Sequence, residues 1–310
     1  MKFLLRLAVV ATTVPFAVSS PCPVAGNRSG VDAFYRSSVD KALERARADL
    51  QQSITLHQDH SSWSDPWVVQ QGPFVVRSTA SWFFSDQAAR NLDTMVGHFE
   101  ALLDRPFPRD ENRNVFVFPD IDGYNSFGGN YGIHSSILGS FYAGQDPQRP
   151  IVSYYHNNPT QVGMWLTHSA SHMYVTRLAA RELPAWMDEG LASYFAYYFW
   201  AYSYGIDELA RLTADGNLTS LSELLGARFE SYTTANSHER FVQLGLLFAY
   251  LIHHYEPSTS PLDEVREGSF VEYLQKAMRG ERLTRHPMHA LIDNPSAELE
   301  PAFRAFSFPR

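Results

Sequence analysis

Cysteine is almost missing from this chain: Cys22 is the only one in 310 residues. A single cysteine cannot form an intramolecular disulfide, so we expect a fold that is stabilised by its core alone. Charge is also sparse, since charged residues make up 19% of the chain and the formal net charge is -8. No stretch is dense enough in Lys and Arg to follow a phosphate backbone or an anionic membrane surface. These absences argue against a disulfide scaffold and against nucleic acid as a partner.

A long hydrophobic run is lacking as well. The apolar stretch Leu7–Val18 has twelve residues, fewer than the roughly 20 that cross a bilayer. It follows the basic residues Lys2 and Arg6 and precedes small residues. This order predicts a signal peptide over residues 1–20, which is removed on export. The mature protein is therefore expected to be secreted or periplasmic, with no transmembrane span.

The composition is that of a folded protein, with 45% hydrophobic and 14% aromatic residues. Apolar spacing predicts two helices and four strands in the first half, with loops and short strands in the Gly-, Asn-, Asp- and Pro-rich stretch after them. The expected helices are 31–54 and 85–103, the strands are 67–69, 74–76, 114–118 and 151–155, and the loop-rich stretch is 120–150.

From about Thr160 onward the pattern is almost wholly helical. Breaks are expected at proline and glycine positions, namely Pro184, Gly205, Gly216, residues 256–261 and Gly280. The prediction is an α+β fold. It has an N-terminal helical segment over 21–66 and a domain over 67–310, whose mixed sheet part covers 67–158 and whose helical part covers 159–310.

Two histidines in this helical region have the spacing of metal ligands. His168 and His172 are four residues apart, so on a helix both imidazoles project from one face and can chelate one ion. Seventeen residues after His172 comes Glu189, which falls near the first turn of a helix that Pro184 can open. Two histidines and a glutamate would leave a fourth zinc position for water.

A histidine pair of this kind often only packs or faces solvent, so the prediction of a metal site depends on the second segment. Residues 183–195 place Glu189 among large apolar side chains, and a buried carboxylate needs a cation or hydrogen bonds. Together the two segments favour a metal site. The remaining alternative is a metal-free structural or binding protein in which His168 and His172 merely pack.

These two segments resemble the peptidase MA-like group of gluzincin zinc peptidases, whose pattern is HExxH followed by a helix with P-x-W-x-x-E-G-x-A-x-Y. The second half matches residues 184–194, and the resemblance extends over about residues 67–305. It implies a zincin-like fold, with a sheet above the metal-binding helix. It also implies zinc as the cofactor, His168, His172 and Glu189 as its ligands, and a peptide or protein as substrate or partner.

The chain departs from the family at the residue that does the chemistry. After the first histidine the family has a glutamate, the general base that takes a proton from the zinc-bound water; here that residue is Ser169. A serine hydroxyl is a very weak base, and general-base assistance contributes roughly 10²–10⁴-fold to the rate. Family members also often carry an oxyanion-stabilising tyrosine in a later helix, where this chain has Phe241.

No replacement base stands out in the sequence. Asp188 would point away from the site, because successive helical residues diverge by about 100°, and it is expected to have a structural or capping role. Nothing selects one of the other histidines, His134, His156, His253 and His254. The aromatic run over residues 194–200 is interpreted as a buried core helix rather than a carbohydrate or lipid groove.

The leading hypothesis is an exported gluzincin-like pseudopeptidase that retains its metal site and binds a peptide or protein. The rival is an active zinc metallopeptidase with a non-standard base.

Overall fold

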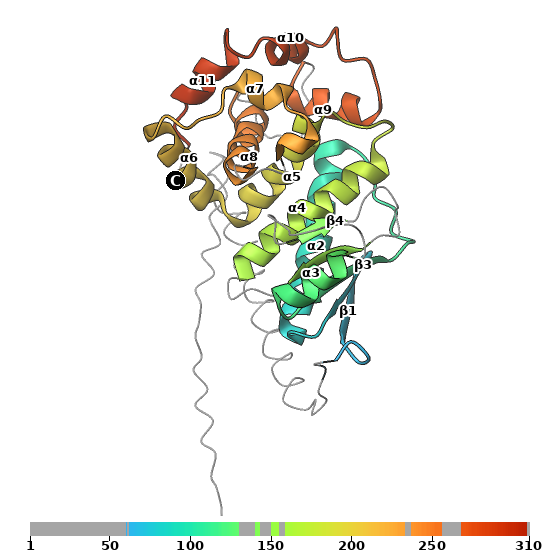
Figure 1. Cartoon of the computed structure of the whole chain (residues 1–310). Coiled ribbons are helices and arrows are strands. Elements are labelled where there is room, and N and C mark those ends of the chain that lie inside the picture. The colour runs from blue at the N-terminus through green and yellow to red at the C-terminus, as the bar shows by residue number, and fades with distance from the viewer. Residues whose placement is uncertain are drawn as a thin grey trace, which may run out of the picture.

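The chain adopts a mixed α+β fold, as the sequence predicts (Figure 1). The computed structural model describes residue 60 and residues 62–129, 140–142, 150–154, 159–232, 237–255 and 268–308. The predicted signal peptide, the expected helix over 31–54 and most of the segment 21–66 lie outside these residues. No helix within the described ranges combines the length and apolar character needed to cross a membrane.

Within the described residues, the strands form one five-stranded sheet in the order β1-β2-β3-β5-β4. The central pairs β2–β3 and β3–β5 are parallel, whereas the outer pairs β1–β2 and β5–β4 are antiparallel. All four predicted strands are therefore present within a residue or two of the expected positions. The bounds are β1 Trp67–Gln71, β2 Phe74–Ser78, β3 Arg113–Phe118, β4 Ser140–Tyr142 and β5 Ile151–Tyr154.

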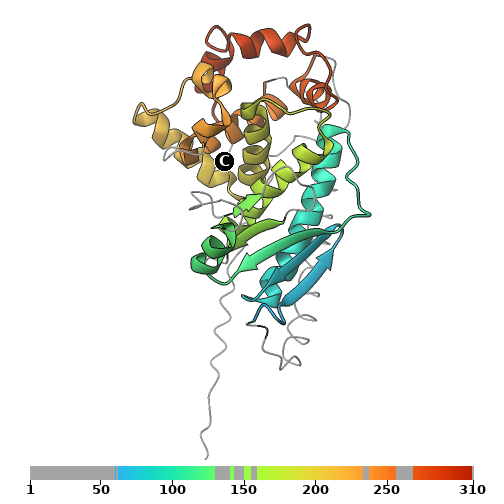
Figure 2. The same ribbon diagram turned by 45° about the vertical axis from the view of Figure 1, so that its right-hand side comes forward.

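The two faces of the sheet are covered by different elements. Val115 and Val117 of β3 join the main core with helix α2 (Trp82–Leu103), whereas Phe116 and Phe118 face the opposite side. This alternation follows from the two-residue period of a strand. Figure 2 shows α2 along one face of the sheet and helix α3 (Ile121–Gly129) on the other.

Helix α3 corrects the prediction that residues 120–150 form only loops and short strands. Asp120 caps its start, because its carboxylate accepts a hydrogen bond from the Gly123 backbone at 2.8 Å. Tyr124 is buried and Phe127 packs against Phe116 and Phe118. Burial of these aromatic rings outweighs the weak helix propensity of a segment that contains three glycines.

The remaining elements are helical, and they lie above the sheet in Figure 1. They are α4 Pro159–Leu178, α5 Ala185–Trp200, α6 Tyr202–Ala214, α7 Leu221–Gly226, a 3₁₀ turn at Phe229–Tyr232, α8 Ser237–His253, α9 Phe270–Met278, α10 Pro287–Asp293 and α11 Leu299–Ala305.

Most of the expected helix breaks are confirmed, with one exception. Pro184 was expected at the first position of the helix, and it is the N-cap of α5, one residue earlier. Gly216 and Gly280 follow the ends of α6 and α9 and have positive φ angles. Gly205, however, lies inside α6. The chain instead turns at Ala201, and Gly205 is buried beside Tyr197 and Leu246. The break 256–261 lies outside the described residues.

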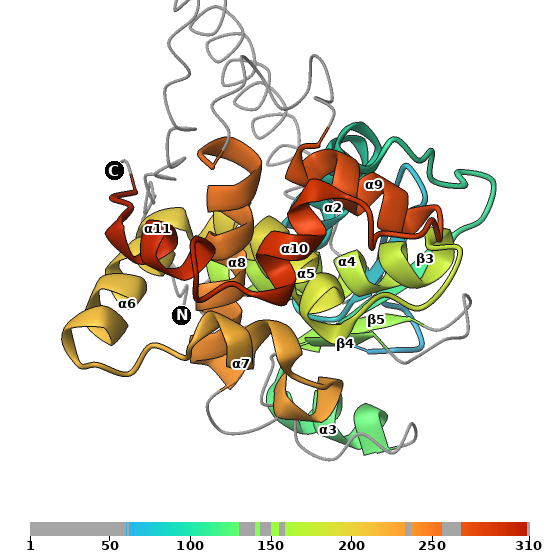
Figure 3. The same cartoon turned by 90° about the horizontal axis from the view of Figure 1, so that it is seen from above.

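Helix α5 is at the centre of the helical part, packed between α4 and α8 (Figure 3). Three aromatic residues of its predicted core run, Tyr194, Phe195 and Tyr197, are buried, and Trp200 at its end is partly buried. The helices approach closely at glycines. A Cβ at Gly190 of α5 would lie 2.1 Å from the ring of Phe248 in α8, and one at Gly245 would lie 2.8 Å from the Ser193 carbonyl oxygen.

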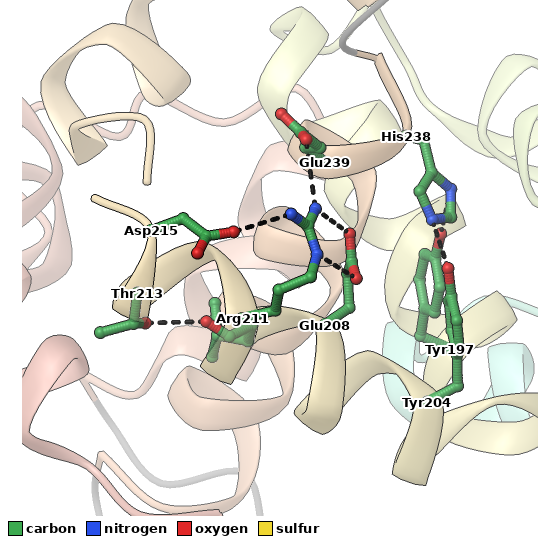
Figure 4. Close-up of polar contacts among 9 residues, drawn as sticks. Tyr197, Tyr204, Glu208, Arg211, Thr213, Asp215, His238 and Glu239 are labelled. Carbon is green, nitrogen blue, oxygen red and sulfur yellow. Dashed lines mark hydrogen bonds and ion pairs between the residues drawn. The ribbon is translucent and has the colours of Figure 1, made fainter. Parts of the chain in front are cut away.

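Polar contacts join α6 to α8 at the edge of this core (Figure 4). Arg211 of α6 forms ion pairs with Glu208 of the same helix and with Asp215 at its C-cap. It also contacts Glu239 of α8. His238 lies between two phenols, with Tyr197 at 3.2 Å from Nδ1 and Tyr204 at 2.9 Å from Nε2. Exposed ion pairs such as those of Arg211 contribute little free energy each, so apolar packing supplies most of the stability.

The glycine contacts predict opposite effects of one substitution at two sites. Gly190→Ala should lower the free energy of unfolding by about 1–3 kcal/mol, because the new methyl group collides with the buried Phe248 ring. Gly97→Ala is the matched control: it lies in exposed α2 surface with nothing within 4 Å, and it should raise stability by up to about 1 kcal/mol. Urea denaturation measures both; a neutral Gly190→Ala would contradict the close approach of α5 and α8.

Candidate metal centre

Helix α4 presents both histidines toward α5. It is packed against α2, α5 and strands β4 and β5, so most of its surface is covered. His168 is buried, and the ring of His172 is only partly exposed. The polar residues between and beside them are satisfied locally: Ser171 donates its hydroxyl hydrogen to the Thr167 carbonyl at 2.8 Å. The four-residue spacing thus places both rings on one buried face, as predicted.

Helix α5 brings Glu189 to the same point. Glu189 is the fifth residue of the helix, just past the first turn in which it was expected, and it is 3% exposed. The absence of a side chain at Gly190 lets α8 cover this part of α5. The carboxylate is therefore held among packed helices rather than at a mobile surface.

Three ligand atoms converge where the two helices meet. The Nε2 atoms of His168 and His172 are 3.1 Å apart, and each is 3.4 Å from Oε2 of Glu189. A tetrahedral zinc ion with bonds of roughly 2.0–2.1 Å holds its ligand atoms about 3.3 Å apart. The spacing of this group fits that geometry, and the three residues can hold a metal ion.

The carboxylate oxygen at the centre of the group points to the same conclusion. Oε2 of Glu189 is buried and accepts no hydrogen bond of acceptable geometry from the described residues. A buried acceptor without a partner costs about 1–3 kcal/mol, and more when it is charged. A cation bound between this oxygen and the two imidazoles would remove that cost. Within the described ranges, this is the one set of three or more His, Cys, Asp or Glu side chains with such convergence.

Asp188 contacts the other side of the same site. Its Oδ1 atom is 3.1 Å from Nδ1 of His172, so consecutive carboxylates of α5 face the two nitrogens of one ring. The prediction that Asp188 points away was wrong, because α4 crosses α5 closely enough for residues 188 and 189 to reach opposite edges of His172. A carboxylate at Nδ1 holds a metal-binding histidine in the tautomer that leaves Nε2 free to bind the ion.

The charges of the protein keep the carboxylate ionised. Burial alone would raise the pKa of Glu189, but its attraction to His172 and its contacts with both histidines lower that pKa to about 2. Burial lowers the pKa of His168. For His172 burial has the same effect, yet the charges of Asp188 and Glu189 outweigh it and raise the pKa. A metal ion would therefore compete with a proton at His172.

The residue after the first histidine supplies no base. Ser169 is 2% exposed, and its hydroxyl cannot hold a proton taken from water near neutral pH. The ring of Phe241 packs against His168 with centroids 5.1 Å apart, so the sequence correctly predicts that this side chain lies at the site. Tyr232 stacks on Phe241, and its hydroxyl donates to the Leu224 carbonyl at 2.6 Å, which keeps the phenol engaged elsewhere.

Of the other candidate histidines, the two that the structure describes do not join the group. Nε2 of His253 is 2.8 Å from the Tyr194 hydroxyl, and His254 packs against Phe306. His134 and His156 lie outside the described residues. The structure thus brings together His168, His172 and Glu189, with Ser169 beside them, and it adds Asp188.

No protein-family model matches this sequence, and a search of curated proteins also finds no match. The metal group is therefore argued from the geometry and chemistry of this chain alone.

Asp188 should tune the affinity for the ion. Asp188→Asn keeps the size of the side chain but removes its charge, and loss of such an outer carboxylate typically weakens metal binding by about 10–100-fold. Competition with a chromophoric zinc chelator measures the change. Asp207→Asn, an exposed substitution on α6, is the control and should bind zinc as the native protein does. Unchanged zinc affinity in Asp188→Asn would remove the proposed role of this carboxylate.

His253 predicts a pH dependence of stability. Burial, together with the charge of His254, lowers its pKa from 6.5 to about 4. The unfolded chain then binds the proton more tightly than the folded one, so stability falls as the pH decreases from about 6.5 toward 4, by an amount on the order of 1–3 kcal/mol. His253→Gln should flatten that part of the curve. Parallel curves for the two proteins, measured by thermal melting, would contradict this expectation.

Proposed function

We propose that this chain is an exported gluzincin-like protein with a zincin-like fold that binds zinc and has lost, or greatly reduced, peptide hydrolysis. Its metal-site region binds a peptide or protein. The observation that carries the proposal is the convergence of His168, His172 and Glu189, combined with a serine where catalysis needs a base. The arrangement of elements supports it: a mixed sheet packs on α4, which carries both histidines, and α5 follows with the glutamate.

The donor set suits zinc. Two imidazole nitrogens and one carboxylate oxygen are common zinc ligands in hydrolytic sites, and three protein ligands leave a fourth position open. When bound there, zinc would polarise a carbonyl and lower the pKa of a water molecule. His168, His172 and Glu189 would hold the ion, and Asp188 would orient His172.

Efficient hydrolysis requires a group that accepts the proton of the water, and this group is missing at its expected place. Ser169 is too weak a base. Among the described residues, Asp188 and Glu189 are the carboxylates that contact the two histidines, and each already faces a ring nitrogen. This engagement favours a binding protein over an active peptidase with a non-standard base.

A metal-free structural role is the third reading, and the buried oxygen of Glu189 argues against it. Without a metal ion that oxygen accepts no hydrogen bond of good geometry from the described residues and has only the two imidazole nitrogens at 3.4 Å, an incomplete compensation in a packed core. Two histidines that merely packed would not need the carboxylate between them.

The sheet offers a route for peptide binding. Strand β4 is one of the two edge strands of the sheet, the other being β1. Among the described residues it pairs with β5 alone, and it packs against α4. An edge strand has backbone N–H and C=O groups available to an extended peptide. A peptide added there would run beside the helix that carries both histidines.

Metal content is the first test of the proposal. Mature protein purified without added zinc should contain close to one zinc per chain by elemental analysis, and His168→Ala/His172→Ala should contain none. The control is a double substitution of two histidines outside the group, His289→Ala/His254→Ala, which should keep its zinc. His286 is left unchanged because it caps α10. No zinc in the native protein, even after zinc is offered, would overturn the proposal.

Restoring the base distinguishes a pseudopeptidase from an active peptidase with a non-standard base. Ser169→Glu should raise cleavage of a mixed peptide library by roughly 10²-fold or more, because a carboxylate then accepts the proton. The matched control, Ser169→Glu/His172→Ala, should be inactive. Strong cleavage by the native protein, with no gain from the glutamate, would favour the rival enzyme.

A further inference from the structure

A second concave site lies away from the metal group. A pocket of about 370 Å³ opens between the start of α5, the loop after α9, and α10. Helices α9 and α10 cover this side of the molecule in Figure 3. The volume falls within the range of about 300–1,000 Å³ that small-molecule sites have. None of the three metal-site residues lines the pocket.

The floor of the pocket is apolar. Trp186 of α5, Tyr273 of α9 and Ile292 of α10 are buried beneath it, and Leu283 is partly buried at its side. Such a floor accepts the apolar body of a ligand and gains free energy from the area removed from water. It does not by itself choose between ligands.

The rim carries two arginines, Arg181 and Arg282. Arg181 donates one hydrogen bond to the Glu281 carbonyl at 2.8 Å, and Arg282 donates one to the Thr284 hydroxyl at 3.2 Å. Neither has an ion pair with a carboxylate of the described residues. A guanidinium has five N–H donors, so most of these donors have no hydrogen-bond partner among the described residues. Arginine holds carboxylates through paired hydrogen bonds.

The two arginine-bearing loops are tied to one another. The Ala180 backbone donates to the Met278 carbonyl at 2.8 Å, and Gly280 follows with a positive φ angle of 72°. A Cβ at Gly280 would lie 3.2 Å from that of Ala180, so the loops meet closely. This contact brings the rim together before any ligand binds, which reduces the entropy cost of binding.

The charge balance of the rim selects the class of ligand. Asp293 also lines the pocket, with His289 at 3.5 Å, and Glu281 on the neighbouring loop is paired with Arg279. Two arginines against one aspartate leave a net charge of about +1, which a single negative charge balances and a double charge exceeds. We propose that this pocket binds a small organic monocarboxylate with an apolar body.

The test is calorimetric titration of the full mature chain with 3-phenylpropionate near neutral pH. Saturable binding in the millimolar range or tighter is expected, and Arg181→Gln/Arg282→Gln should weaken it by about tenfold or more. Arg285→Gln, an exposed arginine of the same loop that does not line the pocket, should bind as the native protein does. Thermal melting checks that each variant folds; both arginines are exposed, so little change is expected.

Three comparisons can overturn the proposal. The neutral amide 3-phenylpropanamide should bind at least about tenfold more weakly, because it lacks the charge that the arginines recognise; equal binding refutes the site. Phenyl phosphate should bind no tighter than the carboxylate, and tighter binding refutes the monoanion assignment. Chelator-treated protein should bind the carboxylate as before, whereas loss of binding would place the carboxylate on the metal. Carboxylate binding by the chelator-treated protein does not depend on the metal site, so it tests this pocket separately from the proposed function.

Discussion

A buried negative charge sets the requirements for the rest of this structure. Glu189 stays ionised, with a pKa of about 2, although it is almost wholly buried. An isolated carboxylate in a packed interior is strongly unfavourable, and it persists only when positive charge or hydrogen bonds compensate for it. The carboxylates of Asp188 and Glu189 raise the pKa of His172, so a proton on this ring is one source of compensating positive charge. A metal ion bound by Glu189 and both imidazoles is the other.

The helices can deliver this arrangement only because they pack closely. Gly163 of α4 faces the ring of Trp200, Gly190 of α5 faces Phe248, and Gly245 of α8 faces the backbone of Ser193. At each crossing the missing side chain lets one helix approach another. Ligand atoms must be held within about half an ångström to bind a metal well, and interlocked helices meet that demand better than loops do.

The surroundings of the two histidines are unequal, and this inequality bears on function. His172 has a carboxylate at its second nitrogen, whereas His168 has the ring of Phe241 beside it. Ser169 adds no proton acceptor. Such a site is better suited to holding an ion than to moving a proton, which agrees with the proposed binding role. The start of α5 also contributes Trp186 to the pocket that Arg181 and Arg282 border. One helix therefore contributes residues to both the metal group and this pocket.

The sequence by itself determined the features that depend on local periodicity. The four-residue spacing of His168 and His172 predicts a shared helical face, because an α-helix repeats every 3.6 residues. Alternation and β-branched residues predict the strands, and Pro184 predicts the start of α5 within one residue. Tertiary structure alone decided α3, the course of the chain through Gly205, the contact of Asp188 with His172, and the pairing of Arg181 with Arg282 on one rim. Each of these depends on packing between separate elements of the fold, and such contacts leave no periodic signal in the sequence.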